Sequence, residues 1–213
     1  MPRTRIKICG ITRPDDAALA QDLGADALGL NFYERSPRHI DLPRAAKVAA
    51  GVGPLTILVG LFVNPTAALV RQVLAAVPLG LLQFHGDEAN DFCSQFQRPW
   101  IKAVRVQNPD AIAAEIDQYP GAQGFLLDSF VEGARGGTGQ TFDWSAIPAL
   151  AKPYMLAGGL TAENVTTAIR QCRPYAVDVS SGVEAAPGIK DAAKMRAFID
   201  AVGRADVQSQ DSR

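Results

Sequence analysis

The 213-residue sequence is poor in the residues that build metal sites and disulfide frameworks, with only two histidines and three cysteines. Cys9, Cys93 and Cys172 are widely separated, odd in number and without CxxC spacing, which favours free thiols in a reducing cytosol. His39 and His85 lie far apart with no aligned pair of carboxylates, which argues against a metal site. We therefore expect a cytoplasmic protein that holds no metal.

The chain also lacks an excess of charge and long apolar runs. A formal net charge of −1 removes any general electrostatic case for binding nucleic acid or an anionic membrane. No apolar run approaches the length needed to cross a bilayer, and the N-terminus enters a predicted strand at once, so we expect no signal peptide. No Gly-x-Gly-x-x-Gly follows the first strand, which argues against a dinucleotide site. The composition, with 47% apolar residues, is that of a soluble globular protein.

Apolar segments rich in β-branched residues alternate with amphipathic, alanine-rich segments along the chain. The predicted strands span 5–9, 26–31, 55–63, 80–84, 100–106, 123–128, 154–157 and 176–179. The predicted helices span 14–23, 43–50, 66–76, 88–96, 109–118, 144–150, 162–171 and 191–202. This alternation is typical of parallel β-α-β construction. Eight such units without a linker predict an α/β protein with one (β/α)₈ TIM barrel over 1–203, rather than an open doubly wound sheet, and a polar, flexible tail over 204–213.

Polar residues recur at the C-terminal ends of these apolar strands. They are Cys9, Asn31, Asn64, His85, Arg105, Asp128, Gly158 with Gly159, and Asp178. Enzymatic sites on a (β/α)₈ barrel lie at these strand ends and in the loops that follow them. The pattern therefore predicts one site at the C-terminal rim of the barrel.

Small residues follow the seventh and eighth strands, where barrels of this class commonly bind phosphate. They are Gly158, Gly159, Ser180, Ser181 and Gly182. Small side chains let backbone N–H groups approach an anion closely, although the glycines could also serve only to make tight turns. Taken together, the two loops predict a phosphorylated small molecule held without a basic side chain.

Four side chains near this rim are candidates for chemistry or substrate contact. Cys9 is by base rate a small buried hydrophobe, but its place at the barrel mouth favours catalysis. Asp128 ends an apolar strand as a candidate general acid or a solvated loop residue, and His85 is either a substrate contact, an acid–base group or a residue bonded to backbone. Arg38, stiffened by the preceding proline, could clamp a carboxylate or bond only water. The long glycine-rich loop 129–143 is a candidate lid, with a simple insertion as the alternative.

The motifs that these residues form resemble those of the phosphoribosylanthranilate isomerase family over residues 7–202. They are Lys7-Ile8-Cys9-Gly10-Ile11-Thr12, Ser36-Pro37-Arg38, Gly60-Leu61-Phe62-Val63-Asn64, Gln83-Phe84-His85-Gly86, Leu126-Leu127-Asp128, Gly136-Gly137-Thr138-Gly139, Leu156-Ala157-Gly158-Gly159-Leu160, Asp178-Val179-Ser180-Ser181-Gly182-Val183-Glu184 and Pro187-Gly188-Ile189-Lys190-Asp191. Each motif is modest, but their order at these strand ends is specific. Phe84 departs from the family pattern, which more often has an aliphatic residue there.

The resemblance implies an Amadori rearrangement of N-(5-phosphoribosyl)anthranilate in tryptophan biosynthesis, without a cofactor. It implies that Asp128 is the general acid and Cys9 the general base, that Arg38 binds the anthranilate carboxylate, and that Asp178 contacts the anthranilate amine. A base must start as a thiolate, so the pKa of Cys9 has to fall below its usual value. We expect no help from Lys7, which lies two residues earlier on the same strand and so deeper in the barrel.

Three other functions fit a barrel with a phosphate site. An epimerase on this fold would more commonly need metal ligands, and a bifunctional isomerase of a histidine-pathway intermediate would want a second anion-binding loop. A sensor that only binds a phosphometabolite would need neither a thiol nor a carboxylate at its strand ends. The sequence gives no oligomeric state; a monomer is the favoured expectation.

Overall fold

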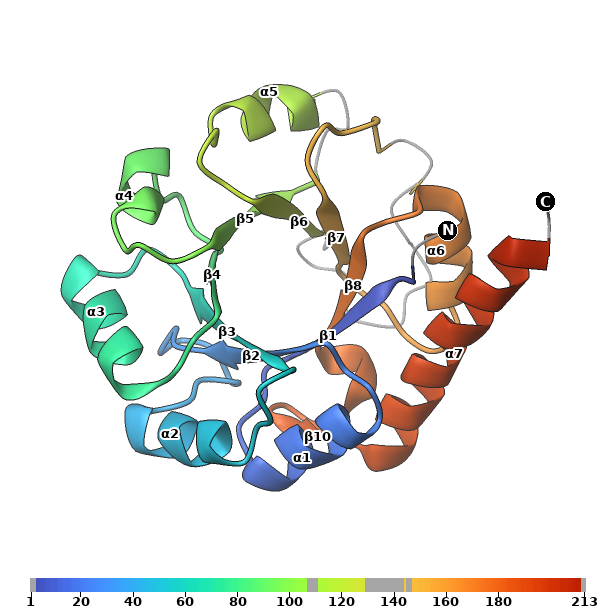
Figure 1. The fold of residues 1–213 in the computed structure, drawn as a ribbon, viewed down its shortest axis with the longest axis horizontal. Helices are drawn as coiled ribbons and strands as arrows, with labels where there is room; N and C mark the ends of the chain where they lie inside the picture. The colour runs from blue at the N-terminus through green and yellow to red at the C-terminus, as the bar shows by residue number, and fades with distance from the viewer. Residues whose placement is uncertain (1–2, 107–110, 129–143, 145–146, 212–213) are drawn as a thin grey trace.

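The computed structural model of the chain describes residues 3–106, 111–128, 144 and 147–211. Eight strands follow one another around a closed barrel, ringed by helices (Figure 1). The strands are β1 (Arg5–Cys9), β2 (Ala27–Asn31), β3 (Ile57–Phe62), β4 (Leu81–Phe84), β5 (Trp100–Arg105), β6 (Gly124–Asp128), β7 (Tyr154–Ala157) and β8 (Ala176–Val179). The helices are α1 (Pro14–Asp22), α2 (Leu42–Ala50), α3 (Ala67–Ala76), α4 (Asn90–Ser94), α5 (Ile112–Asp117), α6 (Val165–Cys172) and α7 (Ala192–Asp211).

The sheet closes because β1 pairs in parallel with both β2 and β8. Lys7 is opposite Asp178 on one side, and Cys9 is opposite Gly29 on the other. An open doubly wound sheet would leave two edge strands, so the predicted (β/α)₈ barrel is confirmed and the open alternative is wrong.

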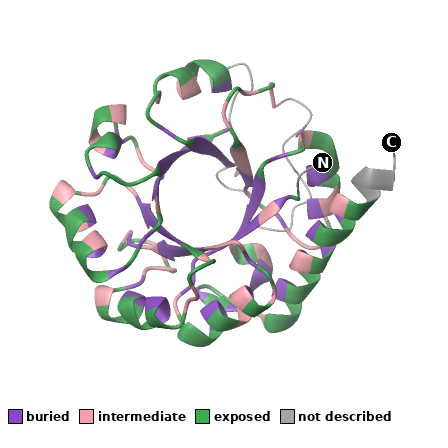
Figure 2. Ribbon diagram, viewed as in Figure 1, coloured by how far each residue is buried: buried purple, intermediate pink, exposed green. Residues whose placement is uncertain are grey.

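Two sets of side chains fill the space on either side of the strands. Buried residues follow the strands and the inner sides of the helices (Figure 2). Inside the barrel, a smaller apolar cluster joins Ile101, Ala103, Leu126 and Ala157 from β5, β6 and β7. The interior beside β1 and β8 is different, because it holds the buried side chains of Lys7 and Asp178. The barrel core is therefore polar on the side where Cys9 lies.

The segment between β6 and β7 differs from the prediction of a helix over 144–150. Among the described residues 144 and 147–153 no α-helix is assigned. Pro148 offers a physical reason, since proline has no backbone N–H to donate inside a helix.

The last helix also differs from its prediction. The sequence pattern predicts an end near Val202 and a flexible tail from residue 204, but α7 continues to Asp211. Ala205 is fully buried, and Asp206 accepts hydrogen bonds from the backbone N–H and the hydroxyl of Thr4, at 2.8 and 2.7 Å. The prediction missed this continuation because the residue that anchors it lies 202 positions earlier in the chain.

A short insert after β8, which the sequence pattern did not predict, lies at the barrel mouth. A 3-10 turn at Ser181–Val183 leads into two short antiparallel strands, β9 (Glu184–Ala186) and β10 (Ile189–Lys190). In the described part of the chain, no helix is both long and apolar enough to cross a membrane.

Candidate active site

A cavity of about 260 Å³ opens at the C-terminal ends of the strands. Nine of the ten predicted site residues line it: Cys9, Arg38, His85, Asp128, Gly158, Gly159, Asp178, Ser180 and Ser181. Gly182, the tenth, lines a neighbouring hollow of about 420 Å³ together with Gly159, Ser181 and Lys194. The barrel therefore brings together in this cavity residues that are up to 172 positions apart in the chain.

Cys9 ends β1 and is buried at the wall of this cavity. Gly10, the next residue, has φ +76°, a left-handed conformation that favours glycine. A side chain on Gly10 would also lie 2.7 Å from Cδ of Arg38 and 3.1 Å from the hydroxyl of Ser180. The glycine therefore lets the loops after β2 and β8 close over the strand end that carries the thiol.

Lys7 lies beneath Cys9, contrary to the expectation that its depth in the barrel would keep it from the thiol. Its Nζ donates a hydrogen bond of 2.8 Å to Oδ1 of Asp178. A Cβ built on Gly29 would lie 3.2 Å from this Nζ and 2.8 Å from Sγ of Cys9, so the ammonium lies close to the sulfur. Depth along a strand was a poor guide because an extended lysine side chain is long enough to reach a neighbour two residues on. The structure thus places a cation close to the candidate base.

Burial raises the pKa of the Cys9 thiol, because it disfavours the charged thiolate. The positive charge of Lys7 is the largest opposing influence, Asp178 adds to the increase, and Lys190 opposes it. Burial by itself would lower the pKa of Lys7, but the carboxylate of Asp178 and the sulfur of Cys9 hold that pKa above its usual value. The ammonium therefore keeps its charge beside the sulfur.

His85 and Asp128 form the opposite wall of the cavity. Nε2 of His85 lies 3.4 Å from Oδ2 of Asp128, and each side chain is 21% exposed. Nδ1 of His85 also lies 3.0 Å from Nε2 of the Gln83 amide, so both ring nitrogens face side-chain partners. The predicted alternative in which His85 is only a backbone-bonded strand end is therefore wrong.

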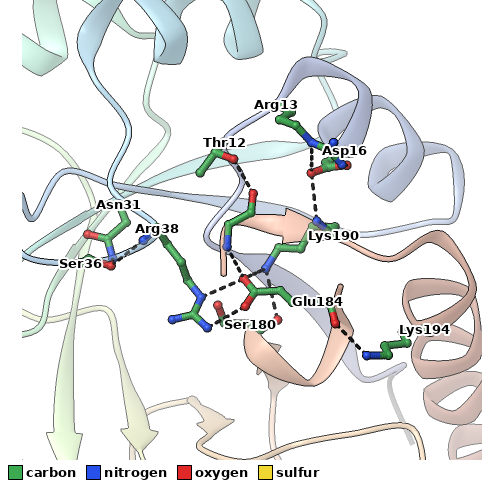
Figure 3. Close-up of polar contacts among 11 residues, drawn as sticks. Thr12, Arg13, Asp16, Asn31, Ser36, Arg38, Ser180, Glu184, Lys190 and Lys194 are labelled. Atoms are coloured by element: carbon green, nitrogen blue, oxygen red, sulfur yellow. Dashed lines mark hydrogen bonds and ion pairs between the residues drawn. The ribbon is translucent and has the colours of Figure 1, made fainter. Parts of the chain in front are cut away.

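Arg38 makes a bidentate contact that the sequence did not predict. Its Nε and Nη2 donate to the two carboxylate oxygens of Glu184, at 2.8 and 2.6 Å (Figure 3). The alternative in which Arg38 bonds only water is wrong. Its function toward a substrate carboxylate stays a prediction.

Glu184 is the residue that links the loops of this side of the site. Besides Arg38, it accepts from Nζ of Lys190 at 2.9 Å and from the backbone N–H of Gly188 at 3.2 Å. Burial by itself would raise the pKa of Glu184, but the hydrogen bonds from Arg38 and Lys190 hold it below its usual value. Lys190 also donates to the carbonyl of Ser180, at 3.2 Å. In the sequence, Glu184 was marked only as the last residue of the motif that begins at Asp178, which gave no indication that it binds Arg38 and Lys190.

The loop after β2 is held by hydrogen bonds of its own. The side-chain amide of Asn31 donates to the hydroxyl of Ser36 at 3.0 Å, and its oxygen accepts from the backbone of Tyr33. The same hydroxyl accepts from the backbone N–H of Arg38 at 3.1 Å (Figure 3). The guanidinium is thus fixed from its backbone as well as from Glu184.

The predicted phosphate loops show the close backbone approach that small residues permit. Gly158 and Gly159 both have positive φ, at 88° and 65°, and the side chain of Asn164 donates to the carbonyl of Gly159. The hydroxyl of Ser180 is buried without a hydrogen-bond partner among the described residues, so it is available to a bound group. Lys194 lies at the edge of the neighbouring hollow. The sequence pattern had predicted a phosphate site without a basic side chain.

The candidate lid over 129–143 lies outside the described residues. Within the described ranges, no three histidine, cysteine, aspartate or glutamate side chains gather as metal ligands would.

A closed barrel with a thiol on one wall of its mouth and a carboxylate on the other has the arrangement that general acid–base catalysis requires. The family described as N-(5'phosphoribosyl)anthranilate (PRA) isomerase matches residues 6–201. The chain belongs to this family of isomerases.

Individual relatives agree over nearly the full length. The chain is 56% identical to the N-(5'-phosphoribosyl)anthranilate isomerase of Pseudomonas paraeruginosa over 203 residues, which is 95% of this chain and 96% of that protein. The crystal structure of phosphoribosyl anthranilate isomerase from Thermotoga maritima has a TM-score of 0.88 at 39% identity, covering 94% of this chain and 99% of that one. Another solved isomerase, in complex with reduced 1-(o-carboxyphenylamino)-1-deoxyribulose 5-phosphate, has a TM-score of 0.82 at 36% identity, with the same coverage.

Proposed function

We propose that this chain catalyses the Amadori rearrangement of N-(5-phosphoribosyl)anthranilate to 1-(2-carboxyphenylamino)-1-deoxyribulose 5-phosphate, a step of tryptophan biosynthesis. Its membership of the isomerase family supports the reaction, and the reduced product analogue bound to one of its structural neighbours supports the substrate. The observation that carries the assignment is the meeting of Cys9 and Asp128 in one cavity at the barrel mouth.

The reaction needs an acid first and a base second. The carboxyl of Asp128 protonates the ribose ring oxygen, which breaks its bond to C1 and leaves an iminium ion there. The thiolate of Cys9 then removes the proton from C2, giving an enolamine and a thiol. When the enolamine tautomerises, C1 gains a proton and the C2 hydroxyl releases one, so the substrate is isomerised with no net change in its protons.

The two ends of the substrate have separate partners. The anthranilate carboxylate binds Arg38, whose Nη1 is the guanidinium nitrogen that has no bond to Glu184 in the structure. The phosphate binds at the loops after β7 and β8, through Gly158, Gly159, Ser180, Ser181 and Gly182. His85 and Asp178 line the space between these ends as further substrate contacts.

A steady-state assay of the purified chain with N-(5-phosphoribosyl)anthranilate tests the function directly, by following the loss of substrate. We expect turnover without added metal or cofactor. An inactive but folded protein would contradict the assignment.

Inorganic phosphate should inhibit competitively with the substrate, because both occupy the loops after β7 and β8. Initial rates at several phosphate concentrations measure the pattern, with potassium chloride at equal ionic strength as the control. We also expect Ser180→Ala to raise both KM and the inhibition constant of phosphate. Purely non-competitive inhibition would count against this phosphate site.

Glu184→Gln should raise KM about tenfold. That is the weakening of substrate binding expected when a charge-assisted hydrogen bond worth ~1.5 kcal/mol no longer orients Arg38. The turnover number should change less, because Glu184 contacts neither acid nor base. Glu34→Gln is the matched control, since Glu34 is exposed on the same loop as Arg38. Equal KM values for the Glu184 and Glu34 variants would show that the contact does not position Arg38.

The active unit is a monomer in the cytoplasm. Every residue given a role lies in one chain, and the thiols Cys9, Cys93 and Cys172 are all free, as a reducing compartment would keep them. Sedimentation at the concentration of the assay tests the monomer; a dimer that loses activity on dilution would contradict it.

A further inference from the structure

The interior of the barrel holds a positive charge, that of Lys7, which has no part in the proposed isomerase reaction. Lys7 is 1% exposed and sits on β1, with its ammonium 2.8 Å from Oδ1 of Asp178. Replacing a buried ion pair with well-packed apolar residues is commonly neutral or stabilising, so stability gives a weak reason for this pair. The facing strands fill the barrel interior with apolar side chains instead, such as Ile101 and Leu126.

The ammonium of Lys7 and the thiol of Cys9 lie close together on the inner wall of the barrel. Alternate residues of a strand face the same side, which places Lys7 and Cys9 on the inner surface of β1. Gly29 of β2 is opposite Cys9, and a Cβ built on it would lie 2.8 Å from Sγ of Cys9 and 3.2 Å from Nζ of Lys7. The space for both groups therefore exists because position 29 has no side chain.

We propose that Lys7, held in place by Asp178, is the positioning residue that stabilises the thiolate of Cys9, and that Gly29 provides the space for both groups. The proposal rests on the proposed function, because it explains how the base of that reaction ionises. When the thiolate forms, the thiol proton passes to water and Lys7 keeps its own proton. Lys7 is thus an electrostatic partner of the base and takes no part in proton transfer to the substrate.

The other charged groups near Cys9 have different partners. Lys190, on β10, is bound to Glu184 and to the carbonyl of Ser180. Arg38, on the loop after β2, is held by both oxygens of Glu184. Asp178, on β8, opposes ionisation of the thiol, and His85 with Asp128 lie across the cavity. Among the cations near the sulfur, Lys7 has the largest lowering effect on the pKa of Cys9.

The test is the pH dependence of Cys9 alkylation in Lys7→Met, which replaces the cation with an apolar chain of similar length. The rate of iodoacetamide labelling of the Cys9 peptide, measured by mass spectrometry, follows the thiolate fraction. An opposite charge within ~4–6 Å shifts a pKa by roughly 1–3 units, so the midpoint should move up by about 1 unit or more in the variant. The pH profile of kcat/KM should move in the same direction.

Two further variants separate this effect from damage to the fold. Lys102→Met is matched for burial, because Lys102 is 2% exposed, is paired with Glu88 at 3.3 Å and lies on the outer side of β5. We expect it to leave the alkylation midpoint of Cys9 unchanged. Lys7→Arg should show a smaller upward shift than Lys7→Met, since it returns the positive charge. If Lys7→Met does not fold, the double variant Lys7→Met with Asp178→Asn takes its place.

An unchanged midpoint in folded Lys7→Met, or an equal shift in Lys102→Met, would overturn the proposal. Gly29→Ala gives an independent check, because its Cβ would push Sγ and Nζ apart; we expect an upward shift there too. Because labelling does not depend on turnover, a failure of Lys7 is distinguishable from a failure of the isomerase reaction itself.

Discussion

Cys9→Ala should lower kcat by about a thousandfold while the protein remains folded, because general base catalysis contributes roughly 10²–10⁴ to a rate. The variant removes the thiolate that takes the C2 proton, and the small cavity left at the wall lies beside solvent in the barrel mouth. Steady-state rates with N-(5-phosphoribosyl)anthranilate measure the loss, and circular dichroism checks the fold. KM should change much less than kcat.

The control for this variant is Cys172→Ala, which removes a half-buried thiol from α6 at a distance from the strand ends. It should retain the activity of the unmodified chain. If folded Cys9→Ala keeps nearly full turnover, the thiol is not the base, even though the chain still belongs to its family.

The ionisation of Cys9 also sets a direction for the pH profile. Because burial raises the pKa of the thiol, kcat/KM should climb with rising pH through the neutral and alkaline range as the thiolate forms. We expect kcat/KM to rise with pH whether Lys7 is present or not, but the midpoint of the rise should depend on the charge of Lys7. A profile that falls across this range would contradict a thiolate base.

Asp128→Asn should lower kcat by about 10²–10⁴, since an amide of the same shape cannot give a proton to the ring oxygen. The contact with His85 at 3.4 Å offers the substituted side chain a partner, so the fold should tolerate the change. The kinetic signature is a loss of kcat with little change in KM. Single-turnover measurement of ring opening locates the loss in the first step.

Asp22→Asn is the matched control, because Asp22 is exposed on α1. It should behave as the unmodified chain does. A folded Asp128→Asn variant with unreduced kcat would transfer the role of acid to another group of the cavity, with His85 as the first to test.

The fold was predictable because it depends on a local pattern repeated along the chain. Strands such as Ile57–Phe62, apolar on both faces, are typical of a sheet covered on both sides, and eight such units without a linker favour a barrel over an open sheet. Closure of the barrel then places all C-terminal strand ends on one rim, so Cys9 and Asp128 could be expected together without knowing any distance.

The contacts that tune the site could not be predicted in the same way. Arg38 and Glu184 are 146 positions apart, and Lys7 and Asp178 are 171 apart. Neither partner carries a local signal for the other, because the contact depends on strand register and side-chain reach. The helical continuation of α7 past residue 203 was missed for the same reason, since Thr4 anchors it.

The sequence alone therefore determined the barrel, the rim that carries the candidate site, and the residue types available there. Periodicity and strand ends are properties of neighbouring residues, which a single chain displays directly. Only the tertiary structure decided that Arg38 is oriented by Glu184 and that Lys7 reaches the thiol. The interaction of two charges weakens with the distance between them, so it depends on where the chain places the two groups. Lys7, Cys9 and Asp178 come close together only once β1, β2 and β8 lie side by side.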